Sequence, residues 1–247
     1  MKKKKSLKEN IITLTYAILA AVFIRSFFFE PFSIPSGSMY PTLEVGDYLF
    51  VSKYDYGFSK HSLPLSIPLI PKRIFYSEPK RGDVIVFKTP EDNKTDYIKR
   101  VIGIPGDEIR MESSSIYVNK QLLKKKKIGE QKYKNLVVER FLEVSPNGKE
   151  YEIFEIKEKN PFIDTDNFNT ILVPKNQFFV LGDNRDNSQD SRFIGAIPKK
   201  NLVGKGRIVF LSFDTNKTGW LTFWNWPKAF RKERFLYSLV PDDHYNK

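Results

Sequence analysis

Two residues of this chain, Ser38 and Lys99, are of the types that could together carry out nucleophilic chemistry. Ser38 follows Gly37, and a glycine allows another chain to approach closely. Lys99 lies among apolar neighbours in the stretch 96–107, where desolvation would favour loss of its proton and make it a general base for a hydroxyl. Taken singly, each pattern leaves a plainer interpretation open: a Ser/Gly/Pro loop for Ser38 and an exposed strand lysine for Lys99.

Other kinds of chemistry find little support in the composition. The chain has no cysteine and only two histidines, His61 and His244, so thiol nucleophiles, cysteine-bound metals and His-rich metal sites are not expected. The polar stretch 182–192 does not have the ligand spacing of a calcium-binding loop. Positions three and twelve of such a loop carry oxygen ligands and position six is glycine, but here they are Arg185, Ile194 and Ser188. We therefore expect no metal and no cofactor, and a polar network that holds this stretch rigid.

The composition of the 247 residues, 40% hydrophobic and 28% charged, is that of a folded domain rather than a disordered chain. The net charge of +12 raises nucleic acid or an anionic membrane as partners. The densest inner lysine run, 124–127, contains no aromatic residue and no nucleic-acid motif. We expect no nucleic-acid partner and interpret this run as a solvated loop.

The N-terminal segment has the properties of a membrane anchor. Residues 11–29 are long enough to cross a bilayer, with Arg25 near one end and five lysines in the preceding residues 1–10. A cleaved secretory signal is the alternative, but no small-x-small site follows the apolar run. We predict a single uncleaved transmembrane helix at 11–29, a cytoplasmic N-terminus at 1–10, and an extracytoplasmic bulk.

Short apolar runs next to Gly-Asp pairs predict a mainly β fold for the exported part. The runs are 48–51, 84–87, 108–111 and 177–181, with weaker alternation at 136–142 and 151–156. We assign 30–111 and 177–247 to an all-β core, and the polar stretch 112–176 to a β-rich inserted subdomain. In the tail, Pro227 could open a helix.

Three sequence boxes together resemble the bacterial type I signal peptidase family, also called the leader peptidases. The first is Ile34-Pro-Ser-Gly-Ser-Met39 with Pro41-Thr-Leu43, and the second runs from Lys80-Arg-Gly-Asp-Val84 through Tyr97-Ile-Lys-Arg100 to Gly103-Ile-Pro-Gly-Asp107. The third is Gly182-Asp-Asn-Arg-Asp-Asn-Ser188 with Asp190-Ser-Arg192. The boxes occur in the family's order and span most of the exported part, apart from the insertion.

The resemblance implies a Ser/Lys dyad on an all-β, membrane-associated protease fold. Ser38 would be the nucleophile and Lys99 the neutral general base, with the Ser38 amide and the Ser36 hydroxyl forming the oxyanion hole. Ser188 would hydrogen-bond and orient the lysine. The supporting polar network would be Arg100, Asp183, Asp190 and Arg192, and the pockets for small substrate side chains would be lined by Phe32, Ile34, Val86 and Ile98.

We therefore expect a serine endopeptidase anchored in the bacterial cytoplasmic membrane that removes signal peptides, with small residues at positions −1 and −3, from exported preproteins. Its partners would be preprotein signal peptides and the lipid bilayer. Two alternatives are a self-cleaving Ser/Lys protease of the repressor type, although this chain starts with an anchor rather than a DNA-binding module, and a non-catalytic envelope scaffold. A cleavage assay separates the scaffold from the enzyme.

The tail leaves one further question open. The tail combines five aromatic residues with four basic residues that lie among them or follow them: Trp220, Phe223, Trp224, Trp226 and Phe230, with Lys228, Arg231, Lys232 and Arg234. These aromatic residues could belong to the core, or they could lie at the membrane interface with the cations facing anionic headgroups.

Overall fold

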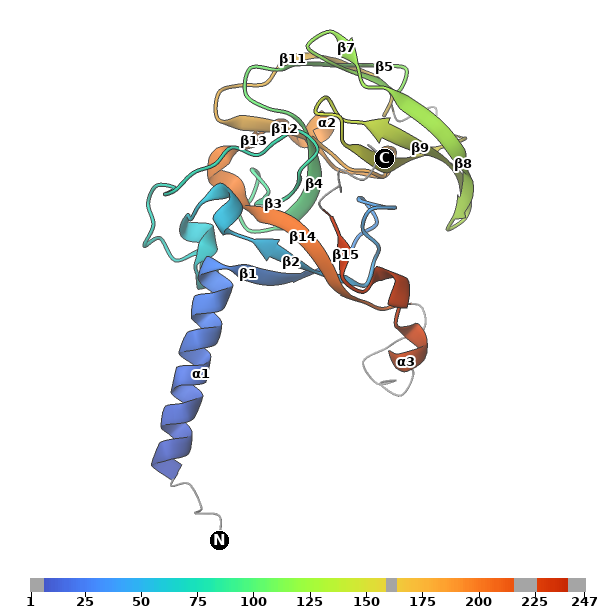
Figure 1. Ribbon diagram of the computed structural model, residues 1–247. Helices are drawn as coiled ribbons and strands as arrows, with labels where there is room; N and C mark the ends of the chain where they lie inside the picture. Colours follow the sequence, from blue (N-terminus) through green and yellow to red (C-terminus); the bar gives the residue numbers. More distant parts are fainter. Residues whose placement is uncertain (1–6, 159–163, 216–225, 240–247) are drawn as a thin grey trace.

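The computed structural model describes residues 7–158, 164–215 and 226–239. Its first element is the helix α1 (Leu7–Phe27), which projects from a β-rich body (Figure 1). All but one of the helix residues are partly or fully exposed, the exception being Ser26, and the mean hydropathy of 1.6 fits a membrane span by length and composition. The helix thus starts four residues before the predicted segment 11–29 and ends two residues before the end of that segment. It ends at Phe27 because Phe29 already pairs with Ser52 in the first two strands.

The largest sheet is antiparallel and follows the order β1-β2-β14-β3-β4-β12-β13, with β15 paired to β14. Its strands are β1 (Phe29–Ser33), β2 (Asp47–Ser52), β3 (Val84–Lys88), β4 (Asp96–Gly103), β12 (Gln177–Leu181), β13 (Ile197–Pro198), β14 (Leu202–Ser212) and β15 (Tyr237–Ser238). The long strand β14 pairs with β2 on one side and with β3 on the other, and β3 in turn pairs with β4, the strand that carries Lys99.

Two smaller sheets complete the β structure. One has the order β11-β5-β6-β7, formed by β5 (Glu108–Glu112), β6 (Ser115–Val118), β7 (Gln121–Leu122) and β11 (Phe168–Leu172). The other has the order β10-β9-β8, formed by β8 (Lys125–Tyr133), β9 (Leu136–Val144) and β10 (Glu150–Ile156). The expected core 30–111 includes most of β5, which pairs with β6 and β11; the proposed domain boundaries stay a prediction.

Short helices lie in the connections. The α-helical turns are α2 (Ser191–Ile194) and α3 (Trp226–Ala229), and the 3-10 turns are η1 (Tyr54–Tyr56), η2 (Lys60–Ser62), η3 (Pro64–Ser66), η4 (Lys199–Asn201) and η6 (Lys232–Arg234). Pro227 lies in the first turn of α3, as the sequence predicted. The mainly β class with one N-terminal apolar helix is confirmed, and the runs flanked by Gly-Asp pairs all lie in strands.

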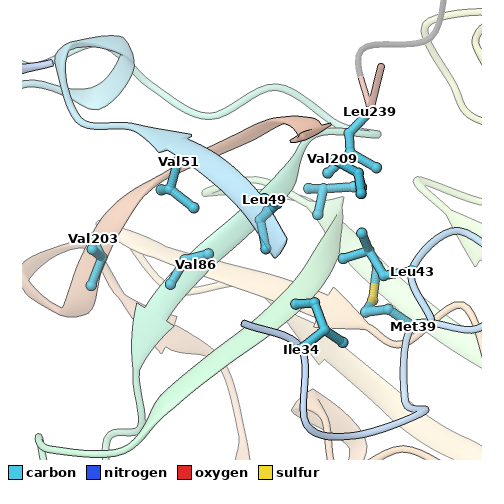
Figure 2. Packing of buried hydrophobic residues seen from close by; sticks show 10 residues of the cluster. Ile34, Met39, Leu43, Leu49, Val51, Val86, Val203, Val209 and Leu239 are labelled. Carbon is cyan, nitrogen blue, oxygen red and sulfur yellow. The ribbon is translucent and has the colours of Figure 1, made fainter. Parts of the chain in front are cut away.

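The core that supports the site lies where the segment after β1 packs against the large sheet. Ile34, Met39 and Leu43 from this segment meet Leu49 and Val86 from β2 and β3 (Figure 2). Phe32 and Ile98 pack against the same cluster while remaining partly exposed. The segment that carries Ser38 is therefore held by burial of the residues on either side of it.

Candidate active site

Ser38 lies in a turn whose backbone is fixed by the loop that follows β12. The Asn184 N–H donates to the Ser38 carbonyl at 3.1 Å, and the Asn184 side-chain amide donates to the Gly37 carbonyl at 2.9 Å. Met39, the next residue, is fully buried. With its neighbours fixed in this way, the Ser38 side chain is presented to the cleft rather than left on a mobile loop.

Lys99 meets Ser38 from the middle of β4. Its Nζ donates to Ser38 Oγ at 2.7 Å and to the Ile98 carbonyl at 2.9 Å. The residue is only 3% exposed, and this burial lowers the pKa of the amine to about 8, although the charges of Asp190 and Asp183 act in the opposite direction. A substantial fraction of Lys99 is therefore neutral near pH 8, as a general base requires.

The other two serines differ in their surroundings. Ser36 is exposed and lines the same cleft as Ser38. Ser188 also lines the cleft, but its hydroxyl oxygen is buried with no hydrogen-bond partner, so the expected hydrogen bond to Lys99 is absent from the structure. The Lys99 amine points to Ser38 and the Ile98 carbonyl instead. Among the described residues, Ser188 thus has a hydroxyl without a hydrogen-bond partner in the cleft that also contains Ser38 and Lys99.

Arg100 and Asp183 form a fully buried ion pair next to Lys99. Arg100 donates to both carboxylate oxygens of Asp183, from Nε at 2.8 Å and from Nη2 at 2.6 Å, and to the Gly82 carbonyl at 2.8 Å. The Thr42 hydroxyl donates to the same carboxylate at 2.5 Å. This pair joins β4, the loop after β12 and the turn that follows Ser38.

Asp190 and Arg192 form the second polar pair of the expected network. Asp190 accepts from Arg192 Nε and Nη2, both at 2.9 Å, and from the Gly182 N–H at 3.0 Å. Arg192 also donates to the Thr165 carbonyl at 2.9 Å. The two pairs hold the stretch 182–192 in one conformation, and within the described residues no group of three or more His, Cys, Asp or Glu could hold a metal ion.

The four residues expected to line substrate pockets all line one cleft with Ser38 and Lys99. The cleft has a volume of about 740 Å³, and its apolar wall includes Phe32, Ile34, Val86 and Ile98. These side chains come from β1, the segment after it, β3 and β4. The cleft can therefore take small apolar side chains next to the Ser38 hydroxyl.

The histidine of the proline-rich loop has no part in this cleft. Burial lowers the pKa of His61 to about 4, and its Nδ1 lies 3.1 Å from the Ser66 hydroxyl in the neighbouring turns. It is therefore neutral at physiological pH and occupied by a local contact. His244 lies outside the described residues.

The aromatic tail is described only in part, since Trp220, Phe223 and Trp224 lie outside the described residues. Trp226 is 48% exposed, with its ring 5.8 Å from that of Phe213. Arg234 is not available to face lipid headgroups as the hypothesis supposed: it is buried and pairs with the Asp47 carboxylate at 2.5 Å. Arg231 pairs with Glu44 at 3.3 Å.

Sequence reasoning gave no role to several residues that the structure brings to the site. Thr42 lies in the first sequence box and Asn184 in the third, so the boxes placed both residues near the site. Their contacts could not be derived from the sequence. Tyr133 and Lys134 lie in the insertion, at the tip of the hairpin formed by β8 and β9, and no motif in the sequence marked them. Nothing in the sequence indicated that this hairpin reaches Gly37.

Taken together, these features define a mainly β protein in which a hydroxyl and a buried amine meet in an apolar cleft, an arrangement suited to base-assisted attack on a carbonyl. The sequence matches the family described as Signal peptidase, peptidase S26, over residues 7–211. The chain belongs to this family and is therefore a peptidase, as the resemblance of the three boxes predicted.

Curated relatives support the same assignment along most of the chain. A protein named Signal peptidase I from Rickettsia typhi is 39% identical, covering 89% of this chain and 85% of the relative. The Signal peptidase I of Rickettsia felis is 38% identical, covering 97% of this chain and 96% of the relative. A crystal structure of a signal peptidase I from Enterococcus faecalis aligns at 25% identity with a TM-score of 0.33, over 52% of this chain and 97% of that one.

Proposed function

We propose that this chain is a serine endopeptidase that cleaves signal peptides from exported preproteins, with Ser38 as the nucleophile and Lys99 as the general base. The observation that carries the proposal is the 2.7 Å contact between Ser38 Oγ and the buried Lys99 Nζ. The relatives' name, Signal peptidase I, supplies the substrate class.

The reaction begins with neutral Lys99. In that state the amine lone pair accepts the Ser38 hydroxyl proton, and Ser38 Oγ attacks the scissile carbonyl to give a tetrahedral intermediate. The protonated Lys99 then gives its proton to the leaving amine, and the acyl-enzyme ester is hydrolysed by a water that the regenerated amine activates.

The negatively charged oxygen of the tetrahedral intermediate must be stabilised by hydrogen-bond donors. Within the described residues the Ser38 N–H makes no hydrogen bond, so it is free to donate to the oxyanion. The exposed Ser36 hydroxyl lines the same cleft and is the second donor we assign. Each such donor contributes on the order of 10²–10³ in turnover in acyl-transfer enzymes.

The substrate and the membrane impose the remaining geometry. Residues −1 and −3 of the preprotein are small and lie against Phe32, Ile34, Val86 and Ile98, which leave shallow apolar space in the cleft. The helix α1 anchors the enzyme with its lysine-rich N-terminus in the bacterial cytoplasm, in line with the positive-inside rule. Because β1 follows α1 almost directly, the cleft stays close to the membrane surface, where cleavage sites emerge.

The test uses the full-length protein in detergent and a preprotein with an Ala-x-Ala cleavage site. Ser38→Ala and Lys99→Ala should each lower cleavage by at least about 10³-fold, and the double variant should lose little more, because the two side chains act as one unit. Ser33→Ala is the matched control, since Ser33 lines the same cleft and is exposed. Substantial cleavage by folded Lys99→Ala, or an equal loss in Ser33→Ala, would contradict the dyad.

A further inference from the structure

The hairpin formed by β8 and β9 reaches from the insertion to the turn that holds the nucleophile. At its tip, the ring of Tyr133 lies 4.7 Å from that of Tyr40, and Tyr40 lies 5.2 Å from Phe154 on β10. These three rings join the small sheet β10-β9-β8 to the segment just after Ser38. The insertion is thus in contact with the site.

The contact is closest at Gly37, the residue before Ser38. A Cβ added to Gly37 would lie 2.1 Å from the Tyr133 hydroxyl oxygen and 3.4 Å from the ring carbon that bears it. Real Cβ atoms do not approach another heavy atom so closely, so the tip can rest on this turn only because residue 37 has no side chain. The position of the hairpin tip is therefore tied to that of the nucleophile.

Tyr133 is followed at the turn by Lys134, which is exposed and lines the cleft together with Ser38 and Lys99. Its Nζ lies 5.5 Å from the centre of the Tyr133 ring, and within the described residues Lys134 forms no ion pair. The insertion contributes one other residue to this cleft, Thr165, which is uncharged. The hairpin tip thus brings a cation to the edge of the cleft.

The other charged residues of the cleft are already engaged. Asp96 pairs with Lys88 at 2.7 Å, and Asp186 accepts from the Ile156 N–H at 2.7 Å and from Thr165 Oγ1 at 2.5 Å. The Lys99 amine contacts Ser38. An acidic substrate side chain that enters the cleft near the hairpin tip would therefore meet Lys134 as its available counter-charge, and a basic side chain would be repelled by it.

We propose that Lys134 selects substrates by the charge of the first residues after the scissile bond, favouring acidic and disfavouring basic side chains. The inference rests on the proposed function. Residues before the scissile bond are small or apolar and fill the wall formed by Phe32, Ile34, Val86 and Ile98, so charge varies chiefly on the mature side. The insertion then supplies a specificity-determining residue, Lys134, held in place through the contact of Tyr133 with Gly37.

The test measures kcat/KM for soluble peptides with an Ala-x-Ala site that differ only at the second residue after the cleaved bond, which is Glu, Gln or Lys. The parent enzyme should prefer Glu over Lys, and Lys134→Glu should change this preference ratio by about tenfold, as expected when an exposed attraction becomes a repulsion. Lys134→Gln should give an intermediate ratio. Raising the salt to about 1 M should flatten the preference, because the Debye length falls to about 3 Å.

Lys132→Glu is the matched control, since Lys132 is an exposed lysine of β8, two residues before Lys134, and does not line the cleft. It makes the same change in net charge and should leave the ratio as in the parent. Equal ratios in the parent and Lys134→Glu, or equal changes in both variants, would overturn the inference. If the parent cleaves none of these peptides and no preprotein, the proposed function itself fails.

A second peptide series, with the charge placed two residues before the cleaved bond, tests the assignment to the mature side. Lys134→Glu should alter its ratio by less than about twofold. A larger effect there than on the mature side would also overturn the inference. Because Lys134 lies at an exposed turn, circular dichroism should show the same fold for all variants.

Discussion

Replacing Lys99 by methionine should remove a folding penalty that depends on pH. Burial lowers the pKa of Lys99 from 10.5 to about 8 in the folded protein. Each pKa unit corresponds to about 1.4 kcal/mol, so folding with a protonated Lys99 costs roughly 3 kcal/mol. The penalty is complete below pH 8, diminishes between pH 8 and 10.5 as the folded state releases its proton first, and is absent above pH 10.5.

Methionine has no charge to desolvate and is similar in length. It also loses the contacts of Nζ with Ser38 Oγ and the Ile98 carbonyl, which offsets part of the gain by about 1 kcal/mol each. That offset varies little with pH, whereas the desolvation penalty varies strongly. The difference in stability between parent and variant should therefore move in favour of the parent by about 3 kcal/mol from pH 7 to pH 10.5.

The assay is thermal unfolding of the full-length proteins in detergent, followed by circular dichroism. For a protein of this size the expected change in the Tm difference is about 6–12 °C across that pH range. Lys132→Met, at an exposed position, should give a Tm difference that does not vary with pH. A pH-independent difference between Lys99→Met and the parent would refute the reasoning that Lys99 is buried with a depressed pKa.

Three other outcomes are expected. The kcat/KM for peptide cleavage should rise with pH through a single ionisation near pH 8, since the proposed general base, Lys99, acts in its neutral form; a rate independent of pH between about 6 and 9 would count against this role. Asp183→Asn should lower the free energy of unfolding by about 3–5 kcal/mol in urea titrations, because Arg100 loses its buried partner, and a loss below about 1 kcal/mol would contradict this. Gly37→Ala should cost about 1–3 kcal/mol, and adding Tyr133→Phe should restore most of it by removing the clashing hydroxyl; strictly additive losses would disprove the contact.

The strands were predictable because their signals are local. Apolar runs flanked by glycine and aspartate marked 84–87 and 177–181, and β3 and β12 occupy Val84–Lys88 and Gln177–Leu181. The ends of α1 were less predictable. The predicted segment 11–29 was set by its run of apolar residues, so it left out the polar residues of the first helical turn. At the other end, Glu30 is buried and pairs with buried Lys53 at 2.8 Å. This contact belongs to β1, which begins at Phe29, the last residue of the predicted apolar segment.

The site was harder to predict, because its contacts join segments far apart in the chain. Lys99 meets Ser38 across 61 residues, and only the resemblance to a known family paired them in advance. Arg234 looked like a surface cation by its sequence neighbours, yet it pairs with Asp47 across 187 residues. Tyr133 carried no motif at all. Local patterns thus indicated which segments are strands, while tertiary packing decided which side chains meet.

The charges around Lys99 explain how an amine can remain a base beside two carboxylates. Asp190 and Asp183 both raise the pKa of Lys99, and unopposed they would keep it protonated. Each carboxylate, however, is held by its own guanidinium: Asp183 by Arg100 at 2.6 Å and Asp190 by Arg192 at 2.9 Å. Each pair has little net charge, so its field at Nζ is weak and desolvation dominates. The buried arginines therefore serve the proposed chemistry without touching the substrate: they neutralise the carboxylates that fix the stretch 182–192, and the amine stays available to Ser38.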